Sequence, residues 1–491
     1  MRTPRSAGIG LVFGLVAVLL SASCETRASL TKSRLKKVEK GLLRAVVIKG
    51  TKADRSPLGE RMEFYKVPGA SVVVLDRYAV DWAKAYGYRD VQAYEPVTPD
   101  TPFQAGALGQ PVAAATVLSL VDRGSLELDA DAGRSLRSWK PSFSEARAGG
   151  TPGLTLRKLL AHASGLSGQV FEGRPRKEPQ PSLAQVLEGE SPAANRPVIE
   201  GFRPDAAGES ESGYVVVQQV VSDASGKPFP AFAEEAVLAP LGMTNSSFEA
   251  PLPAALESRA ASGHLRPGPG VEGGWLNYCE AASKGLWTTA IDYADFLLAV
   301  VGDAMGRPKK LLSPDSARTM LTPQSRGRGF GFLIEGSGND VRFSVRGRTC
   351  GFAALAVFYP ARGQGLVVMT NSDNGGLLAD ELLRAVSATY AWPDYKPEEK
   401  PLLRLDPSTY AQYVGRYEIA PDYALDVTFE DYYLIIHPTG QARTKFYVES
   451  ETVFFSVDPF IRIQFRRDDK GVVDGLVLWQ EDFEQKAVKV R

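Results

Sequence analysis

Two patterns of apolar and polar positions divide the first 390 residues of this chain. An unbroken apolar and β-branched run at 67–75 predicts a buried strand, and residues 80–88 predict its hairpin partner. Pro111 opens an almost wholly apolar stretch that closes near Gly124, which predicts a buried helix. Further helices are predicted at 155–161, 213–225, 231–241, 290–301 and 380–390, and strand patterns return at 330–358 and 365–370. Because strands flank a helical middle, we expect an α/β (α+β) domain whose terminal segments share one sheet.

A charged, proline-bearing stretch then separates the remainder of the chain. The letters KPEEKP at 396–401 predict a linker, which we place at 395–403. Short alternating runs spaced by turns follow and predict a small antiparallel, barrel-like β domain at 404–491. These runs lie at 415–418, 425–429, 433–436, 453–455, 461–465 and 475–478.

The N-terminus has the composition of an export signal. Arg2 and Arg5 precede an apolar segment at 9–20, which is shorter than the roughly 20 residues that span a bilayer as a helix. The letters LSAS before Cys24 resemble a bacterial lipobox, which implies a lipid anchor on that cysteine. Ordinary signal cleavage before Cys24 is the alternative. In either case we expect residues 1–23 to be removed, which leaves an exported protein of the periplasm or envelope. Its main domain is expected to span 24–394.

The net charge and the numbers of histidines and cysteines argue against nucleic-acid binding, a metal site and a disulfide framework. Lys plus Arg and Asp plus Glu both number 57, and this balance argues against a nucleic-acid binder. The histidines are His162, His264 and His437, without metal-ligand spacing, and nothing indicates a metal or organic cofactor. Three cysteines cannot form a disulfide framework, and we expect Cys279 and Cys350 to stay unpaired.

Several longer stretches carry a family resemblance. They are VPGASVVVLD (67–76), TPDTPFQAG (98–106), LRKLLAHASGL (156–166), SGKPFPAFAEEAVLAPLGMTNSSF (225–248), GLWTTAIDYADFLL (285–298) and GQGLVVMTNSDNGG (363–376). Together they resemble the serine β-lactamase and penicillin-binding-protein-like family, nearest to its class C β-lactamase and esterase branch. The resemblance implies a sheet flanked by helices and a serine hydrolase, and the C-terminal part resembles a small β domain often appended to it. Function must still be judged at the site.

The catalytic motifs that the resemblance implies are altered in this chain. A Ser-x-x-Lys motif should follow FQAG, but the two positions hold Ala107, which has no nucleophilic atom, and Gln110, which is neutral. A Tyr-x-Asn motif should precede Gly213-Tyr214, and its outer positions hold Glu209 and Glu211. At the third motif, Lys-Thr-Gly or His-x-Gly, the chain has Val345-Arg346-Gly347, so only the glycine remains.

Loss of all three motifs predicts a pseudoenzyme that serves as a binding or scaffold module. Its partner would be a cell-wall peptide, another small molecule or an envelope protein. An active esterase or amidase with a rearranged site is the alternative, and a purely structural envelope protein is a third hypothesis. A covalent adduct would indicate the active esterase or amidase, and saturable binding of a ligand would indicate the binding module.

New charges at the altered motifs are the candidate binding residues. Glu209 and Glu211 entered the second motif, and Arg346 and Arg348 lie in or beside the third, so ion pairs across the cleft are one hypothesis. The other hypothesis is that these charges are scattered and have no function. Strand alternation places the two arginines on one face and Val345 with Gly347 on the opposite face.

Other candidate nucleophiles have simpler interpretations. Ser164 and His162 occur where the family carries a structural His-x-Ser-Gly-Leu, Ser119 lies within the predicted buried helix, and Cys350 has no nearby histidine in the sequence. We expect all of them to be structural.

Overall fold

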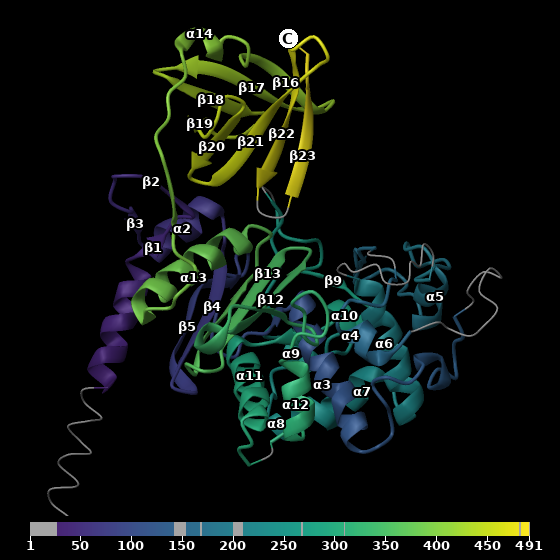
Figure 1. Ribbon diagram of the computed structural model, residues 1–491. Coiled ribbons are helices and arrows are strands. Elements are labelled where there is room, and N and C mark those ends of the chain that lie inside the picture. The colour runs from purple at the N-terminus through teal and green to yellow at the C-terminus, as the bar shows by residue number, and fades with distance from the viewer. Residues whose placement is uncertain are drawn as a thin grey trace, which may run out of the picture. The chain divides into compact units, whose positions relative to one another are not determined.

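The computed structural model describes residues 27–141, 154–166, 169–199, 210–266, 269–308, 310–480 and 483–490. The chain divides into two compact units, Met62–Ala379 and a second that combines Met1–Arg61 with Asp380–Arg491. Figure 1 shows the helices and strands of both. The predicted export signal at 1–23 and Cys24 lie outside the described residues.

A seven-stranded sheet lies at the centre of the Met62–Ala379 unit, in the order β11-β12-β13-β14-β4-β5-β6. Its strands are β11 (Leu333–Glu335), β12 (Arg342–Thr349), β13 (Phe352–Tyr359), β14 (Gln364–Thr370), β4 (Gly69–Asp76), β5 (Ala79–Asp90) and β6 (Glu95–Pro96). β4 pairs antiparallel with β14, with Val73 opposite Val367, so the expectation that early and late segments share one sheet is confirmed. Every residue of β4 and β13 is buried, which explains their unbroken apolar runs.

Helices pack against this sheet and against one another. The core joins Val117 of α3, Val217 of α6 and Phe296 of α11 to Val73 and Val367 of the sheet. The helices of this part are α3 (Gly109–Asp122), α4 (Leu156–Leu160), α5 (Leu183–Glu188), α6 (Glu211–Ser225), α7 (Phe229–Ala233), α8 (Ala239–Leu241), α9 (Ala254–Glu257), α10 (Ala281–Lys284), α11 (Ala290–Ala304) and α12 (Pro314–Met320). α13 (Gly375–Tyr390) begins in this unit and continues into the second.

One predicted helix is divided in the structure. We expected a single helix at 231–241, but a π-helical turn at Glu234–Leu238 separates α7 from α8. Pro240 has no backbone N–H to continue the regular hydrogen-bond ladder, which is a physical reason for the interruption.

The C-terminal strands form a closed antiparallel barrel, as the sequence predicted. The barrel consists of β16 (Gly415–Ala420), β17 (Tyr423–Glu430), β18 (Tyr433–Pro438), β19 (Thr444–Val448), β20 (Val453–Val457), β21 (Phe460–Arg467), β22 (Val473–Gln480) and β23 (Phe483–Lys489). β19 and β23 were missed. β19 has five residues, and within the described part of β23 only Ala487 is buried, so neither gives a strong apolar signal.

Part of the predicted linker is a strand instead. β15 (Glu398–Lys400) pairs in parallel with β2 (Val46–Ile48), in the same compact unit. Lys400 is buried, and its Nζ lies 3.0 Å from carboxylate oxygens of both Glu398 and Glu449. Strand pairing and this double ion pair hold a segment that its composition alone marks as flexible.

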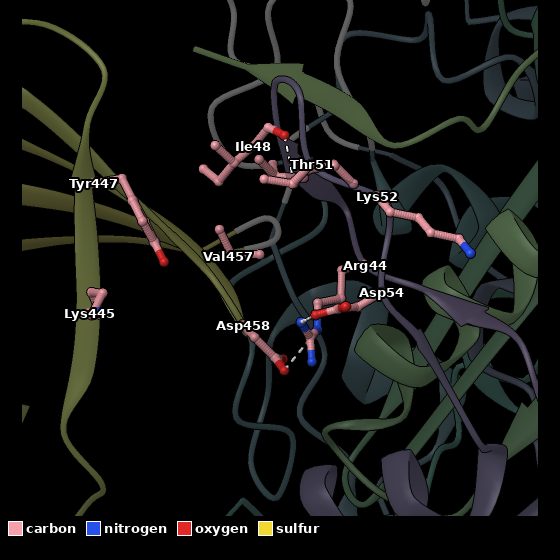
Figure 2. A pocket seen from close by; sticks show the side chains of 11 residues that line it. Arg44, Ile48, Thr51, Lys52, Asp54, Lys445, Tyr447, Val457 and Asp458 are labelled. Carbon is pink, nitrogen blue, oxygen red and sulfur yellow. Dashed lines mark hydrogen bonds and ion pairs between the residues drawn. The ribbon is translucent and has the colours of Figure 1, made fainter. Parts of the chain in front are cut away.

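The N-terminal segment also lines a pocket of about 530 Å³ in this unit. Residues 27–39 are helical, and β1 (Leu42–Leu43), β2, β3 (Arg55–Ser56) and α2 (Leu58–Tyr65) follow. Figure 2 shows Ile48 and Thr51 on one side of the pocket and Lys445 and Tyr447 of β19 on the other.

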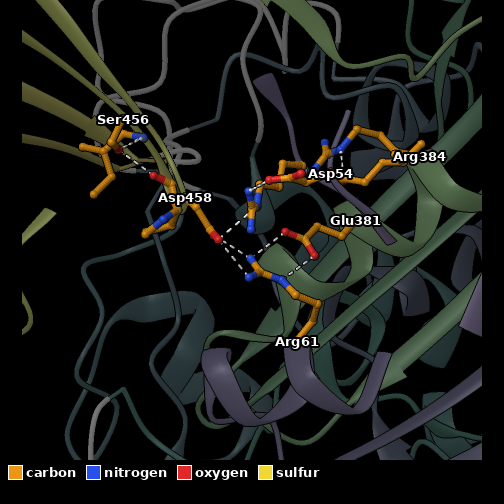
Figure 3. Close-up of polar contacts among 10 residues, drawn as sticks. Asp54, Arg61, Glu381, Arg384, Ser456 and Asp458 are labelled. Atoms are coloured by element: carbon orange, nitrogen blue, oxygen red, sulfur yellow. Dashed lines mark hydrogen bonds and ion pairs between the residues drawn. The ribbon is translucent and has the colours of Figure 1, made fainter. Parts of the chain in front are cut away.

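A buried arginine connects three segments of the same unit (Figure 3). The Arg61 guanidinium donates to both carboxylate oxygens of Glu381, at 2.8 Å each. It also donates to both oxygens of Asp458, at 2.9 and 2.6 Å. Arg44 joins the group, with Nε 3.0 Å from Asp458 and Nη1 2.8 Å from Asp54. A planar guanidinium suits such two-sided bidentate pairing.

Removing one member of this buried network should destabilise the protein. We expect Glu381→Leu to cost about 3 kcal/mol, because it leaves the buried Arg61 charge partly uncompensated. Glu430→Gln, which breaks the exposed pair with Arg443, should cost at most about 1 kcal/mol. Urea unfolding followed by circular dichroism measures both variants. Equal small losses would contradict the role given to Arg61.

Candidate functional site

The first altered motif lies in a short 3-10 helix, Gly106–Leu108, that leads directly into α3. Ala107 is half-buried and presents only a methyl group where the family has its serine. The backbone N–H of Ala105 donates to the Leu286 carbonyl at 2.9 Å, which ties this turn to the segment after α10. The Ala107 side chain offers no atom that could act as a nucleophile.

Two glycines allow β12 to approach this turn closely. A Cβ atom built on Gly347 would lie 1.9 Å from the Ala105 carbonyl oxygen. Gly106 has φ +55, and its Cβ would lie 2.6 Å from the Arg348 backbone nitrogen. No side chain fits at either position. Packing alone therefore accounts for Gly347, the single residue of the third motif that this chain retains.

Gln110, at the position of the family lysine, is engaged by a buried histidine. The backbone N–H of Ser210 donates to His162 Nδ1 at 3.1 Å, so that nitrogen is an acceptor and carries no proton. The proton is then on Nε2, which lies 3.1 Å from Gln110 Oε1 and donates to it. His162 also packs on the ring of Tyr214, with centroids 5.3 Å apart. The resulting chain of neutral groups contains no base of the strength that a lysine amine would supply.

Glu211, from the second motif, forms an ion pair that the sequence did not suggest. Its Oε1 lies 3.1 Å from Lys284 Nζ, and its Oε2 accepts the Phe171 backbone N–H at 3.1 Å. Lys284 is buried and donates to the Phe171 carbonyl at 2.9 Å. Its helix, α10, contacts both α6 and the 3-10 turn that carries Ala107.

A signal for Lys284 was present in the sequence. It is the only charged residue in the stretch 281–291, within and beside the family segment GLWTTA. A lone lysine among small and apolar residues indicates burial with a counter-ion. Lys284 directly precedes the family segment and is not among the residues that the altered motifs single out.

The remaining candidate binding residues are placed only in part. Glu209 lies outside the described residues. On β12, Val345, Gly347 and Thr349 are buried while Arg346 is exposed, which agrees with the predicted alternation of faces. The hypothesis that Arg346 or Arg348 pairs with the glutamates stays a prediction.

A second carboxyl group lies beside the Glu211–Lys284 pair. Glu280 directly precedes α10 and is 6% exposed. Burial raises the pKa of its carboxyl group above the ordinary value, an effect that nearby Lys284 only partly opposes. Cys279 donates its thiol proton to Glu280 Oε1 at 3.3 Å, and burial together with that carboxyl raises the pKa of the thiol.

The other candidate nucleophiles have structural surroundings. Cys279 and Cys350 are free thiols. Burial, and secondarily the Asp373 carboxylate, raises the pKa of Cys350, which favours the unreactive protonated form. Ser119 donates to the Thr116 carbonyl within α3 at 2.8 Å, and Ser164 is buried. These observations give no activated nucleophile among them.

Metal-binding clusters and membrane-spanning helices are both absent from the described residues. No group of three or more His, Cys, Asp or Glu side chains in the described part could hold a metal ion. Among the same residues, no helix has the length and apolar character required to cross a membrane.

Replacing Glu280 should alter how stability depends on pH. A raised pKa means that the contribution of this carboxyl to stability is complete below the unfolded value of about 4.5 and is lost as the pH rises through the folded value. Glu280→Gln removes that loss. We therefore expect its melting temperature relative to wild type to increase between pH 4.5 and pH 8.

Glu172→Gln, on an exposed side chain, controls for the loss of one negative charge. Scanning calorimetry across this pH range measures all three proteins. A constant difference between Glu280→Gln and wild type would contradict the burial argument, in which Lys284, Glu211 and Cys279 are the neighbouring titratable groups.

Comparisons with known proteins agree with this geometry. The family model described as Beta-lactamase matches residues 57–390. Penicillin-binding protein 4* of Bacillus subtilis is 21% identical over 456 residues, covering 88% of this chain and 97% of that protein. Esterase EstB of Burkholderia gladioli is 29% identical over 191 residues, which cover 37% of this chain and 47% of that protein.

Solved structures show the same fold. The octameric penicillin-binding protein homologue from Pyrococcus abyssi has a TM-score of 0.57 at 19% identity, covering 87% of this chain and 98% of that one. A class C beta lactamase from Rhodobacter sphaeroides has a TM-score of 0.52 at 16% identity, covering 68% and 98%. Together with the family match over most of its length, these likenesses identify the chain as a member of the beta-lactamase family.

Proposed function

We propose that this protein has lost the serine chemistry of its family and acts as a binding module. The observation that carries the proposal is Ala107, whose methyl group stands at the start of α3 where an acyl bond would have to form. Covalent catalysis of this kind requires a hydroxyl or thiol nucleophile at that point. A carbonyl compound in the cleft would find no atom to attack it there.

The surrounding groups support the same conclusion. Gln110 accepts a hydrogen bond from His162 and has no basic nitrogen, so it cannot take a proton at neutral pH. Glu211 is a carboxylate, but its two oxygens are bound to Lys284 and to the Phe171 N–H. A base without a nearby hydroxyl has nothing to activate.

Export to the envelope belongs to this proposal. The basic, apolar and small-residue segments before Cys24 support it, and a lipid on that cysteine would anchor the module. The ligand would be a cell-wall peptide, another small molecule or an envelope protein.

Intact-mass spectrometry tests the loss of acylation. Purified protein is incubated with a penicillin, a cephalosporin and a fluorophosphonate, beside an Ala107→Ser, Gln110→Lys variant. We expect no mass increase on wild type, and no turnover of a chromogenic β-lactam or short ester above the uncatalysed rate. The variant shows whether a hydroxyl at 107 is the missing element.

A stoichiometric adduct on wild type would overturn the proposal and favour the rearranged esterase or amidase. Peptide mapping would then identify the nucleophile. Adduct formation by the variant alone would show that the cleft still admits the reagents.

A further inference from the structure

A small pocket lies beside the Glu211–Lys284 pair and is not part of the altered catalytic motifs. Its volume is about 190 Å³, and Phe171, Arg174, Asn195, Asn277, Cys279 and Glu280 are among the residues that line it. Two short strands, β8 (Arg174–Pro175) and β9 (Leu276–Asn277), pair along it. An apolar cavity of roughly 150 Å³ accommodates benzene, so this volume suits a ligand of amino-acid size.

One buried polar atom of a residue that lines this pocket has no partner among the described residues. Glu280 is 94% buried by its 6% exposure, and its Oε2 has no hydrogen-bond donor. Its Oε1 receives only the weak thiol donor of Cys279. A buried carboxyl oxygen without a donor is costly, and such exceptions in folded proteins call for an explanation.

The nearest cation does not supply that donor. Lys284 follows Glu280 by four residues, but its Nζ is directed to Glu211 Oε1 and to the Phe171 carbonyl. The carboxyl groups of Glu211 and Glu280 therefore both lie near the Lys284 ammonium group, which pairs with Glu211. A second cation would complete the arrangement around Glu280.

Charge at the pocket favours a cationic ligand. Glu172 and Glu280 both line it. The only basic lining residue, Arg174, already donates to Glu178 at 2.8 Å and to the Pro192 carbonyl at 2.6 Å. Its Nε is buried without an acceptor, which leaves one donor for a neutral or anionic group on the same ligand.

We propose that this pocket binds a small primary amine of amino-acid size, with its ammonium group donating to Glu280 Oε2. An acceptor on the same ligand, such as an amide carbonyl, takes the hydrogen bond of Arg174 Nε. The inference deepens the proposed function and rests on it, because it names the ligand class of a protein proposed to bind rather than to react. The wall at Phe171 also contacts Glu211 and Lys284 through its backbone, so the pocket adjoins the family cleft.

Isothermal titration with three probes tests the ligand class. Alaninamide in either enantiomer carries an ammonium and an amide, alanine adds a carboxylate, and N-acetylalaninamide lacks the ammonium. We expect wild type to bind at least one enantiomer of alaninamide, and to bind N-acetylalaninamide at least tenfold more weakly.

Glu280→Gln keeps the size of the side chain and removes its charge. We expect it to weaken alaninamide binding at least tenfold, whereas the matched Glu418→Gln variant, at an exposed position of β16 that does not line this pocket, retains most of the affinity. Circular dichroism spectra and melting temperatures show that both variants are folded.

No alaninamide binding by wild type, or equal binding by Glu280→Gln, would overturn the inference. Equal binding of the acetylated probe would do the same. Failure of the proposed function is distinguishable, because a covalent penicillin adduct is detected by mass on protein without amine, whereas amine binding is detected by heat on protein without penicillin. If neither an adduct nor amine binding is observed, the inference about this pocket is wrong while the proposed loss of serine chemistry still stands.

Discussion

The hydrogen bond from the Ser210 backbone to His162 determines the chemistry available at the altered site. A backbone N–H can only donate, so Nδ1 must accept, and Nε2 must carry the proton that is given to Gln110. A lysine ammonium at position 110 would place a second hydrogen-bond donor against the N–H of His162 Nε2, which needs an acceptor. Gln110 is therefore matched to the histidine tautomer, as an acceptor that faces a ring N–H.

The backbone of the family cleft persists around these changes because it depends on atoms other than the catalytic side chains. Gly347 and Gly106 allow β12 and the turn before α3 to lie in direct contact, and a Cβ on either glycine would overlap the other segment. Lys284 is buried and pairs with Glu211 in the same region. Since desolvation offsets much of the attraction in a buried ion pair, this pair is better evidence for the positioning of its side chains than for a gain in stability.

Much of the fold could be predicted because burial leaves a strong local pattern. The fully buried β4 and the helix from Pro111 toward Gly124 appear within about two residues of the expected ends. β15 was hidden, because its pairing with β2 depends on residues 352 positions away and its own composition is that of a linker. β23 was hidden because, of the side chains described, it buries only Ala487.

The motif positions were assigned from FQAG and the Gly213-Tyr214 pair, and that assignment stays a prediction. The partners of those residues could not be predicted from the sequence. That Glu211 meets Lys284, 73 positions later, and that Gln110 meets His162 depend on how separate helices and loops pack. The charges alone had suggested arginine partners on β12, a pairing that stays a prediction.

The tautomer of His162 tests the central claim most directly. The chain has only three histidines, so ¹⁵N-histidine labelling with a His162→Gln variant assigns the ring signals in long-range ¹H–¹⁵N spectra. The account predicts a neutral ring at pH 7, with the proton on Nε2 and an unprotonated Nδ1. A proton on Nδ1, or a doubly protonated ring, would contradict it.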